Sequence, residues 1–168
     1  MNRCYKTSLI LLAPLIGLLL TGCSGNSYLM KQVSYSEPAK PGQDETLVYI
    51  LRENSFFGGG RKFAIIANDT VVGVLMPKDF TYFKLQSGEN EIVAYMSPSP
   101  LMHYRVQGRA GESVFLYCRM GYGSGIFIEE ISEQQAREFM RTFSYTEIGV
   151  KGAKAKMDYR EYYDKMYD

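Results

Sequence analysis

KFAIIANDTVVGVLM, residues 62–76, predicts two β-strands joined by a tight turn. Two short apolar runs, rich in β-branched side chains, flank the dipeptide Asn68-Asp69. Runs of this length and composition are typical of strands, and both turn residues tolerate the positive φ that a tight hairpin needs. Gly73, inside the second run, predicts a bulge or a close backbone contact.

The same sequence pattern continues on both sides of this hairpin. Short β-rich runs alternate with turn signals, which is the signature of an antiparallel sandwich or barrel. The further runs are TLVYILRE (46–53), DFTYFKL (79–85), NEIVAYMS (90–97), LMHYRVQ (101–107), SVFLYCRM (113–120) and IFIEEI (126–131). We therefore predict a mainly β protein, an antiparallel β-sandwich of about eight strands, closed by one C-terminal helix over residues 45–145.

The helix is predicted in SEQQAREFMRTF, directly after the last strand. Ser132 and Gln135 have the spacing of a capping box. Four apolar residues follow the i, i+3, i+4, i+7 spacing of a helix face: Ala136, Phe139, Met140 and Phe143. This face should dock on the sandwich, with Arg137 and Arg141 outside. Because both strands of the 62–76 hairpin are apolar on two faces, we expect the helix to cover their second face.

The N-terminus has the pattern of an exported and lipidated protein. Two basic residues precede an apolar stretch, residues 9–20, which has the length of a signal-peptide core and is too short to cross a bilayer as a helix. LTGC (20–23) follows and resembles the bacterial lipobox, in which the cysteine receives a diacylglycerol and the chain is cut before it. We therefore predict a lipoprotein signal peptide over residues 1–22 and a mature N-terminus at lipidated Cys23.

Lipidation at Cys23 implies a location and a membrane partner. Lipoproteins of this class usually carry three acyl chains, and two or more chains hold a protein firmly on a membrane. Ser24 goes with the outer membrane in lipoproteins of Gram-negative bacteria. We expect an acylated (palmitate-bearing) protein of the cell envelope that faces the periplasm. Residues 23–44, which are polar and contain Ser, Pro and Gly, predict a flexible tether.

A tyrosine-rich tail, residues 146–168, ends the chain. Its last part, MDYREYYDKMYD, places four residues at helical spacing: Tyr159, Tyr162, Tyr163 and Met166. A helix this short is marginal alone. Two interpretations stay open: a frayed, partly helical tail, or an aromatic stripe that folds on contact with a partner or a second copy of the chain.

Five segments of the domain each carry a distinct turn or strand motif. They are LVYILRENSFFGGG (47–60), NDTVVGVL (68–75), SGEN (87–90), AGESVFLYCRMG (110–121) and EEISEQQAREFM (129–140). Together they resemble a family of small bacterial lipoproteins catalogued only as a domain of unknown function, which is similar to PEGA-type β-domains of cell-envelope proteins. Thr70 and the SGEN turn depart from the family's usual turn residues. The resemblance implies a β-domain over residues 45–143 and brings no catalytic residue.

Composition gives little support for catalysis or nucleic-acid binding. Without the predicted signal peptide the chain has 17 basic and 18 acidic residues, a net charge of −1, and no block of like charges to attract nucleic acid. The single histidine, His103, has no histidine or cysteine at metal-ligand spacing. No G-x-S-x-G motif nominates a nucleophile, and the glycine clusters lack P-loop spacing. We predict no cofactor, no metal site and no catalytic residue.

The remaining candidates are contact residues. Phe56 and Phe57, in the loop NSFFGGG, either fold back onto the core or form a contact site. Cys118 is expected to be a small buried hydrophobe. An excess of tyrosine, 14 residues, favours a non-catalytic interaction or structural module that binds an envelope protein or itself. The alternative is a periplasmic binding or enzymatic module acting on a wall polymer or carbohydrate, which needs exposed aromatic residues lining a groove with convergent polar groups.

Overall fold

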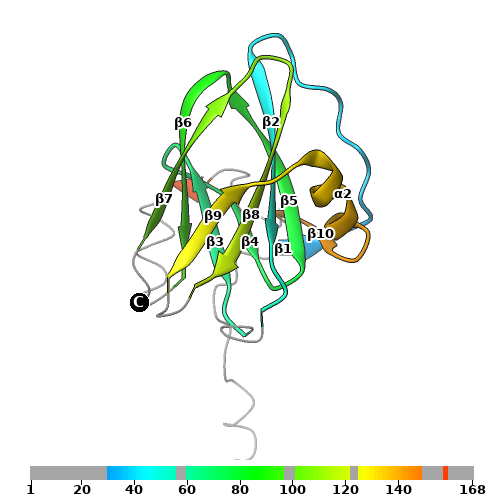
Figure 1. Ribbon diagram of the computed structural model, residues 1–168, viewed down its shortest axis with the longest axis vertical. Coiled ribbons are helices and arrows are strands. Elements are labelled where there is room, and N and C mark those ends of the chain that lie inside the picture. Colours follow the sequence, from blue (N-terminus) through cyan, green and yellow to red (C-terminus); the bar gives the residue numbers. More distant parts are fainter. Residues whose placement is uncertain (1–29, 56–59, 97–100, 122–124, 149–156, 159–168) are drawn as a thin grey trace, which may run out of the picture.

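A computed structural model describes residues 30–55, 60–96, 101–121, 125–148 and 157–158 as a β-sandwich of two sheets (Figure 1). The six-stranded sheet has the order β1 (Met30–Gln32), β10 (Ser144–Ile148), β5 (Asp79–Gln86), β2 (Glu45–Arg52), β8 (Ser113–Met120) and β9 (Ile126–Glu130). The five-stranded sheet has the order β11 (Met157–Asp158), β4 (Thr70–Leu75), β3 (Phe63–Ala67), β6 (Gly88–Tyr95) and β7 (Met102–Gly108). The mainly β prediction is confirmed.

The eight predicted strands are β2 to β9, and the predicted hairpin joins β3 to β4. Asn68 and Asp69 take the two positive-φ positions of the turn, at 44° and 64°. The β3–β4 register shifts between Ile65 and Ile66, opposite Gly73, so the predicted bulge is present. Because a bulge adds one residue to a strand, it changes which way the neighbouring side chain points.

Two strand pairs differ from the predicted antiparallel arrangement. β2 pairs with β8 in parallel, and β10 pairs with β5 in parallel. The interior of β2 is buried on both faces, as is usual for a strand with a parallel neighbour. Strands β1, β10 and β11 were not predicted, because each is short and lies in a polar stretch of sequence.

The main core lies between the two sheets. It is built from alternating residues of both inner faces, among them Val48, Ile50, Phe63, Ile65 and Leu116. Cys118 belongs to this core and is fully buried, which confirms its prediction as a small hydrophobe. Burial raises the pKa of the Cys118 thiol to about 12, so the thiolate that would react is absent at neutral pH.

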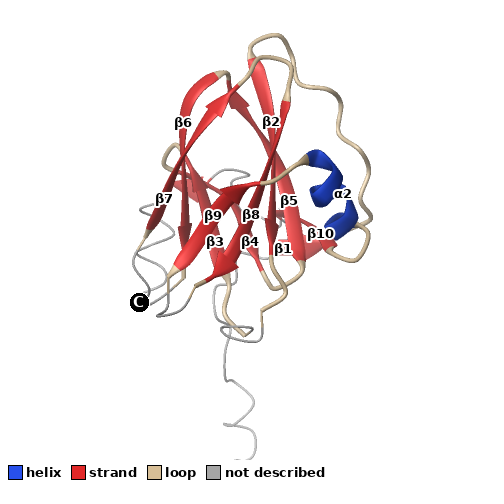
Figure 2. Cartoon of the chain, in the orientation of Figure 1, coloured by secondary structure: helices blue, strands red, loops and turns tan. Residues whose placement is uncertain are grey.

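The helix α2, Glu133–Met140, begins with the predicted capping box. The Ser132 Oγ accepts from the Gln135 backbone N–H at 3.3 Å, and the Gln135 side chain accepts from the Ser132 backbone N–H at 3.1 Å. Ala136 of the predicted apolar face is buried, and Phe139 and Met140 are half-buried. This face packs against β8 in the six-stranded sheet (Figure 2) and not against the 62–76 hairpin. That part of the prediction is wrong because two residues separate β9 from α2, which keeps the helix on the sheet that contains β9.

Residues from Met30 onward pack on the domain, although the sequence predicts a flexible tether over 23–44. β1 pairs with β10, and Val33 and Tyr35 pack on a second apolar cluster that α2 also covers. Figure 1 shows this blue-to-cyan segment running along the outside of the six-stranded sheet past α2. Likewise, β10 and β11 bring part of the predicted 146–168 tail into the two sheets.

A group of four residues, here called the clasp, holds this segment to the helix: Tyr35, Glu37, Tyr49 and Arg137. The Arg137 guanidinium donates to both Glu37 carboxylate oxygens, at 2.7 and 2.6 Å. The Tyr35 and Tyr49 hydroxyls donate to the same carboxylate, at 2.5 and 3.0 Å. Arg137 is therefore half-buried over the sheet and not outside as predicted, whereas Arg141 is exposed. The planar guanidinium of Arg137 donates one hydrogen bond to each oxygen of the carboxylate. The helical spacing in the sequence does not reveal this contact.

Replacing Glu37 with glutamine should weaken the fold in a pH-dependent way. The hydrogen bonds from Arg137 lower the pKa of the Glu37 carboxyl to about 2. Because the folded pKa lies below the unfolded one, this stabilisation is present above about pH 4.5 and is lost as the pH falls toward 2. The pair is partly solvent-exposed, so we expect a loss of about 1 kcal/mol at pH 7, measured by urea unfolding.

The control is Glu112→Gln, whose partner Arg109 lies 3.5 Å away at an exposed site. That variant should unfold like the parent protein. A difference between Glu37→Gln and the parent that stays the same from pH 7 to pH 2 would contradict the clasp as the source of the effect.

Candidate functional site

Every residue that the sequence nominates for lipidation or contact lies outside the described part of the chain. Cys23 precedes Met30, and Phe56 and Phe57 lie within the 56–59 gap. The tail residues all follow Asp158: Tyr159, Tyr162, Tyr163 and Met166. These stay predictions. The described residues offer a different candidate, a groove along one margin of the sandwich.

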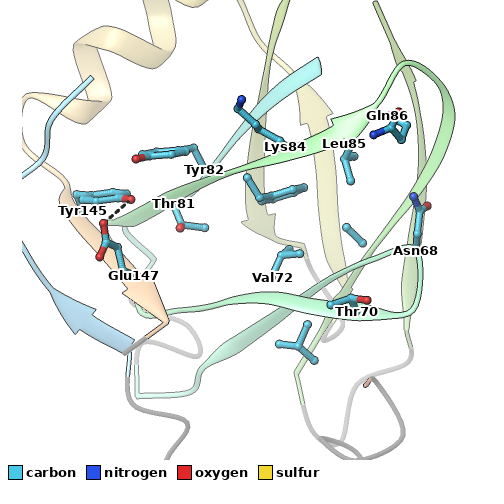
Figure 3. Close-up of a pocket in the computed structure, with 13 residues that line it drawn as sticks. Asn68, Thr70, Val72, Thr81, Tyr82, Lys84, Leu85, Gln86, Tyr145 and Glu147 are labelled. Atoms are coloured by element: carbon cyan, nitrogen blue, oxygen red, sulfur yellow. Dashed lines mark hydrogen bonds between the residues drawn. The ribbon is translucent and has the colours of Figure 1, made fainter. Parts of the chain in front are cut away.

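The sandwich has two margins, where edge strands of the two sheets come together. β7 lies next to β9 at one margin, whereas β4 lies next to β5 and β10 at the other. At the other margin a groove of about 610 Å³ lies between β4 and β5, with β10 at one end (Figure 3). Clefts of this size are typical of binding sites.

The floor of the groove is apolar and comes from both sheets. Val72 from β4, and Phe83 and Leu85 from β5, are half-buried against the edge of the main core. In Figure 3, Leu85 points from β5 toward β4, and Val72 stands on β4 below it. Val72 is the residue added by the bulge, since Gly73 pairs with Ile65 and Val71 with Ile66. The bulge thus places one more apolar side chain in the groove.

Polar groups lie at the two ends of this floor. Asn68 and Thr70, at the β3–β4 turn, and Gln86, at the end of β5, line one end. Glu147 of β10 lines the other end. Hydrogen-bonding groups placed around an apolar floor can fix the orientation of a bound molecule.

Two stacked tyrosines border the groove beside Glu147. The rings of Tyr82 and Tyr145 lie 5.2 Å apart and 5° from parallel. The Tyr145 hydroxyl donates to Glu147 Oε1 at 3.0 Å, the dashed line in Figure 3. Burial raises the pKa of Tyr145, so the hydroxyl keeps its proton and acts as a donor. The pair forms a fixed wall at this end of the groove.

One edge of β5 faces the groove. β2 pairs with the other edge from Leu51↔Phe80 to Glu45↔Gln86. β10 pairs with the groove-side edge only at Asp79 and Phe80 and then turns away to pair with β1. Of the strands that the structure describes, none pairs with this edge beyond Phe80. Open backbone groups on an edge strand are a template for an added strand.

The charged side chains of the groove lining are already engaged. The Lys84 ammonium lies 2.6 Å from a Glu45 carboxylate oxygen, and Glu147 accepts from Tyr145. His103 lies elsewhere, on the outer face of the five-stranded sheet, 2.9 Å from Glu91. Across the described ranges no three His, Cys, Asp or Glu side chains gather as a metal site. The groove therefore offers backbone hydrogen bonds, an apolar floor and polar ends.

Sequence reasoning missed the groove because its lining comes from β4, β5, β10 and the β3–β4 turn. Only one signal was available. Phe83 and Leu85 alternate with Tyr82 and Lys84, so both faces of this run carry large side chains. That pattern indicates a strand with something on each side, but it does not indicate which strand edge stays open.

Comparisons with protein-family models, with curated proteins and with solved structures found no match for this chain. Within the described residues, no helix combines the length and the apolar character needed to span a membrane. The geometry of the groove is therefore the basis for a functional proposal.

Proposed function

We propose that this protein is a lipid-anchored module of the bacterial cell envelope, attached through Cys23, that binds an extended segment of a partner protein in the groove and performs no catalysis. The open edge of β5, Thr81 to Gln86, carries the proposal. An added strand would satisfy the backbone groups of this edge, and its alternate side chains would contact the floor. Six residues of strand span about 20 Å, enough to hold a short extended peptide.

The alternative ligand, a wall polymer or carbohydrate, finds partial support in the polar ends of the groove. A sugar ring binds best on the open face of an aromatic ring. Tyr82 and Tyr145 stack on each other, and Tyr145 is only 6% exposed. Tyr117, on the outer face of the same sheet, stacks on Phe139 at 4.9 Å. Tyr82 and Tyr145 are thus engaged with each other, and Phe83 on the floor is partly buried against the main core. We therefore favour a polypeptide and treat a carbohydrate as an outcome of the test.

The anchor is tested separately from the groove. Cells fed a radiolabelled fatty acid should incorporate it into the parent protein and into Cys118→Ala, but not into Cys23→Ser. We expect only the Cys23 substitution to abolish labelling, because the other cysteine of the mature chain, Cys118, is fully buried. Label that persists in Cys23→Ser, or a parent protein that is washed from membranes by buffer without detergent, would contradict the anchor.

The groove is tested by placing one carboxylate on its floor. Val72→Asp puts a charge where the partner's apolar side chains would lie, whereas Ile128→Asp makes the matched change at a half-buried position of β9 on the β7–β9 margin. After crosslinking in intact cells, Val72→Asp should recover at least about tenfold less partner protein, a loss of about 1.4 kcal/mol. Ile128→Asp should recover partner like the parent protein, with folding of both variants checked by thermal unfolding.

Equal recovery with both variants would exclude the groove as the partner site. Binding of soluble cell-wall fragments that Val72→Asp abolishes, without any crosslinked protein, would replace the polypeptide by the carbohydrate alternative.

A further inference from the structure

The five-stranded sheet has an apolar outer face. Six side chains on that face, here called the outer patch, are between 0% and 8% exposed: Ala64, Ile66, Val71, Val74, Val93 and Tyr95. They come from β3, β4 and β6 and point away from the main core. The outer face of β7 beside them is polar, with His103 and Arg105 exposed.

No helix or strand in the described ranges lies over the outer patch. The strands all belong to the two sheets, which meet through their inner faces, and α2 packs on the six-stranded sheet. The patch is nevertheless as buried as the main core. Leu101, just before β7, packs against the patch, but one side chain cannot cover six. The rest of the cover must therefore come from residues outside the described ranges.

We propose that residues 159–168, at the C-terminus, are this cover and pack their aromatic stripe on the outer patch. β11 places the chain next to the outer patch, since Met157 pairs with Val71 of the patch and Asp158 pairs with Thr70. Tyr159 therefore follows directly from the margin of the same sheet. No other segment outside the described ranges enters from a strand on the β4 edge of this sheet and leaves a chain end to lie across it.

Length and composition fit this position. Ten helical residues span about 15 Å, and three strand spacings, from β4 across β3 and β6 to β7, span about 14 Å. The stripe, Tyr159, Tyr162, Tyr163 and Met166, would face the patch, with Glu161 and Lys165 on the solvent side. The adjoining segment, residues 149–156, fits less well because it reads GVKGAKAK and holds three lysines and no aromatic residue. This cover goes beyond the groove and the anchor, and its failure would leave both untouched.

Thiol labelling of the full mature protein in detergent tests the cover. With Cys23 acylated, the native thiol left is Cys118, which is fully buried and reports unfolding if it reacts. Val93→Cys places a reporter in the patch, and Ser87→Cys, at an exposed turn, gives the rate for an open site. The patch reporter should react slowly, and combined Tyr159→Ser, Tyr162→Ser and Tyr163→Ser should speed it at least about tenfold. The matched control, Glu161→Ser with Lys165→Ser, should leave it slow.

The proposal is overturned if the patch reporter already reacts at the open-site rate, if the tyrosine variants leave it slow, or if the control speeds it equally. A second measurement does not depend on those variants. A photoreactive phenylalanine at Tyr162 should crosslink within one chain to peptides of β3 or β6. Crosslinks that join two chains and rise with protein concentration would assign the patch to a second copy instead, and crosslinks elsewhere would reject the cover.

Discussion

Replacing Arg52 with methionine is expected to lower the free energy of unfolding by about 3–5 kcal/mol, the usual effect of removing one member of a buried charged network. Arg52 ends β2 and is fully buried. One guanidinium nitrogen, Nη1, donates to the backbone carbonyls of Arg61 and Leu75, at 2.5 and 2.6 Å. The guanidinium also lies 3.7 Å from the centre of the Phe63 ring. The Arg52 side chain thus connects β2 both to the end of β4 and to the residues that lead into β3.

Methionine keeps much of the volume of Arg52 and removes the charge and the donors. The two carbonyls then lose a buried donor. Burial raises the pKa of Asp79, which is 4% exposed, and the variant removes the Arg52 charge that partly offsets this rise. Burial lowers the pKa of Arg52 to about 10, so the guanidinium is charged at pH 7 and its loss is felt there. Arg52→Lys should recover only part of the stability, because an ammonium cannot reproduce the planar stacking.

Urea unfolding at pH 7 measures this effect. The matched control is Arg119→Met, at a position that is 45% exposed and 3.3 Å from Glu129, where we expect a change of at most about 1 kcal/mol. Equal effects at the two positions would contradict the assignment of Arg52 as a structural cation.

Replacing Phe80 with alanine should cost about 3–5 kcal/mol, the range for truncating a buried aromatic ring. Phe80 is 1% exposed and belongs to the second cluster, on the outer face of the six-stranded sheet. Its ring lies 5.3 Å from that of Tyr35 and 5.4 Å from that of Tyr145. It therefore supports both the N-terminal segment and the tyrosine wall of the groove.

Two readouts separate this account from a general loss of packing. Phe80→Ala should raise hydrogen exchange in residues 33–37 more than in β3 or β6, which belong to the other sheet. Phe127→Ala, at a ring that is 43% exposed, should change stability by about 0.5 kcal/mol or less. Uniform exchange throughout the domain would mean that the second cluster does not hold the N-terminal segment.

The parts of the fold set by local chemistry could be predicted from the sequence. Asn68 and Asp69 tolerate positive φ, and Gly73 marks a bulge. Ser132 and Gln135 cap a helix. Each of these residues determines the conformation of only a few neighbouring residues. The sheet that α2 covers depends on which strands share a sheet, and the 62–76 hairpin pattern does not contain that information. β1 and β10 form strands by pairing with each other. Neither sequence is apolar enough to predict a strand by itself.

The candidate site was less predictable for the same reason. Tyr82 and Tyr145 are 63 positions apart and meet only because β10 pairs in parallel with the start of β5. Likewise, Glu37 and Arg137 meet because the N-terminal segment crosses α2. Residue types indicated contact surfaces in general, but the open edge of β5 follows from β10 turning away after Tyr145, a property of the sheet and not of any motif.

Photocrosslinking in intact cells tests the proposed function most directly. A photoreactive phenylalanine replaces Gln86, an exposed residue that lines the groove, or Gln107, an exposed residue of β7 at the β7–β9 margin. The proposal predicts crosslinks to one envelope protein from Gln86, through a short extended segment of that protein, and none from Gln107. No crosslinked protein at Gln86, or the same products from both positions, would contradict it.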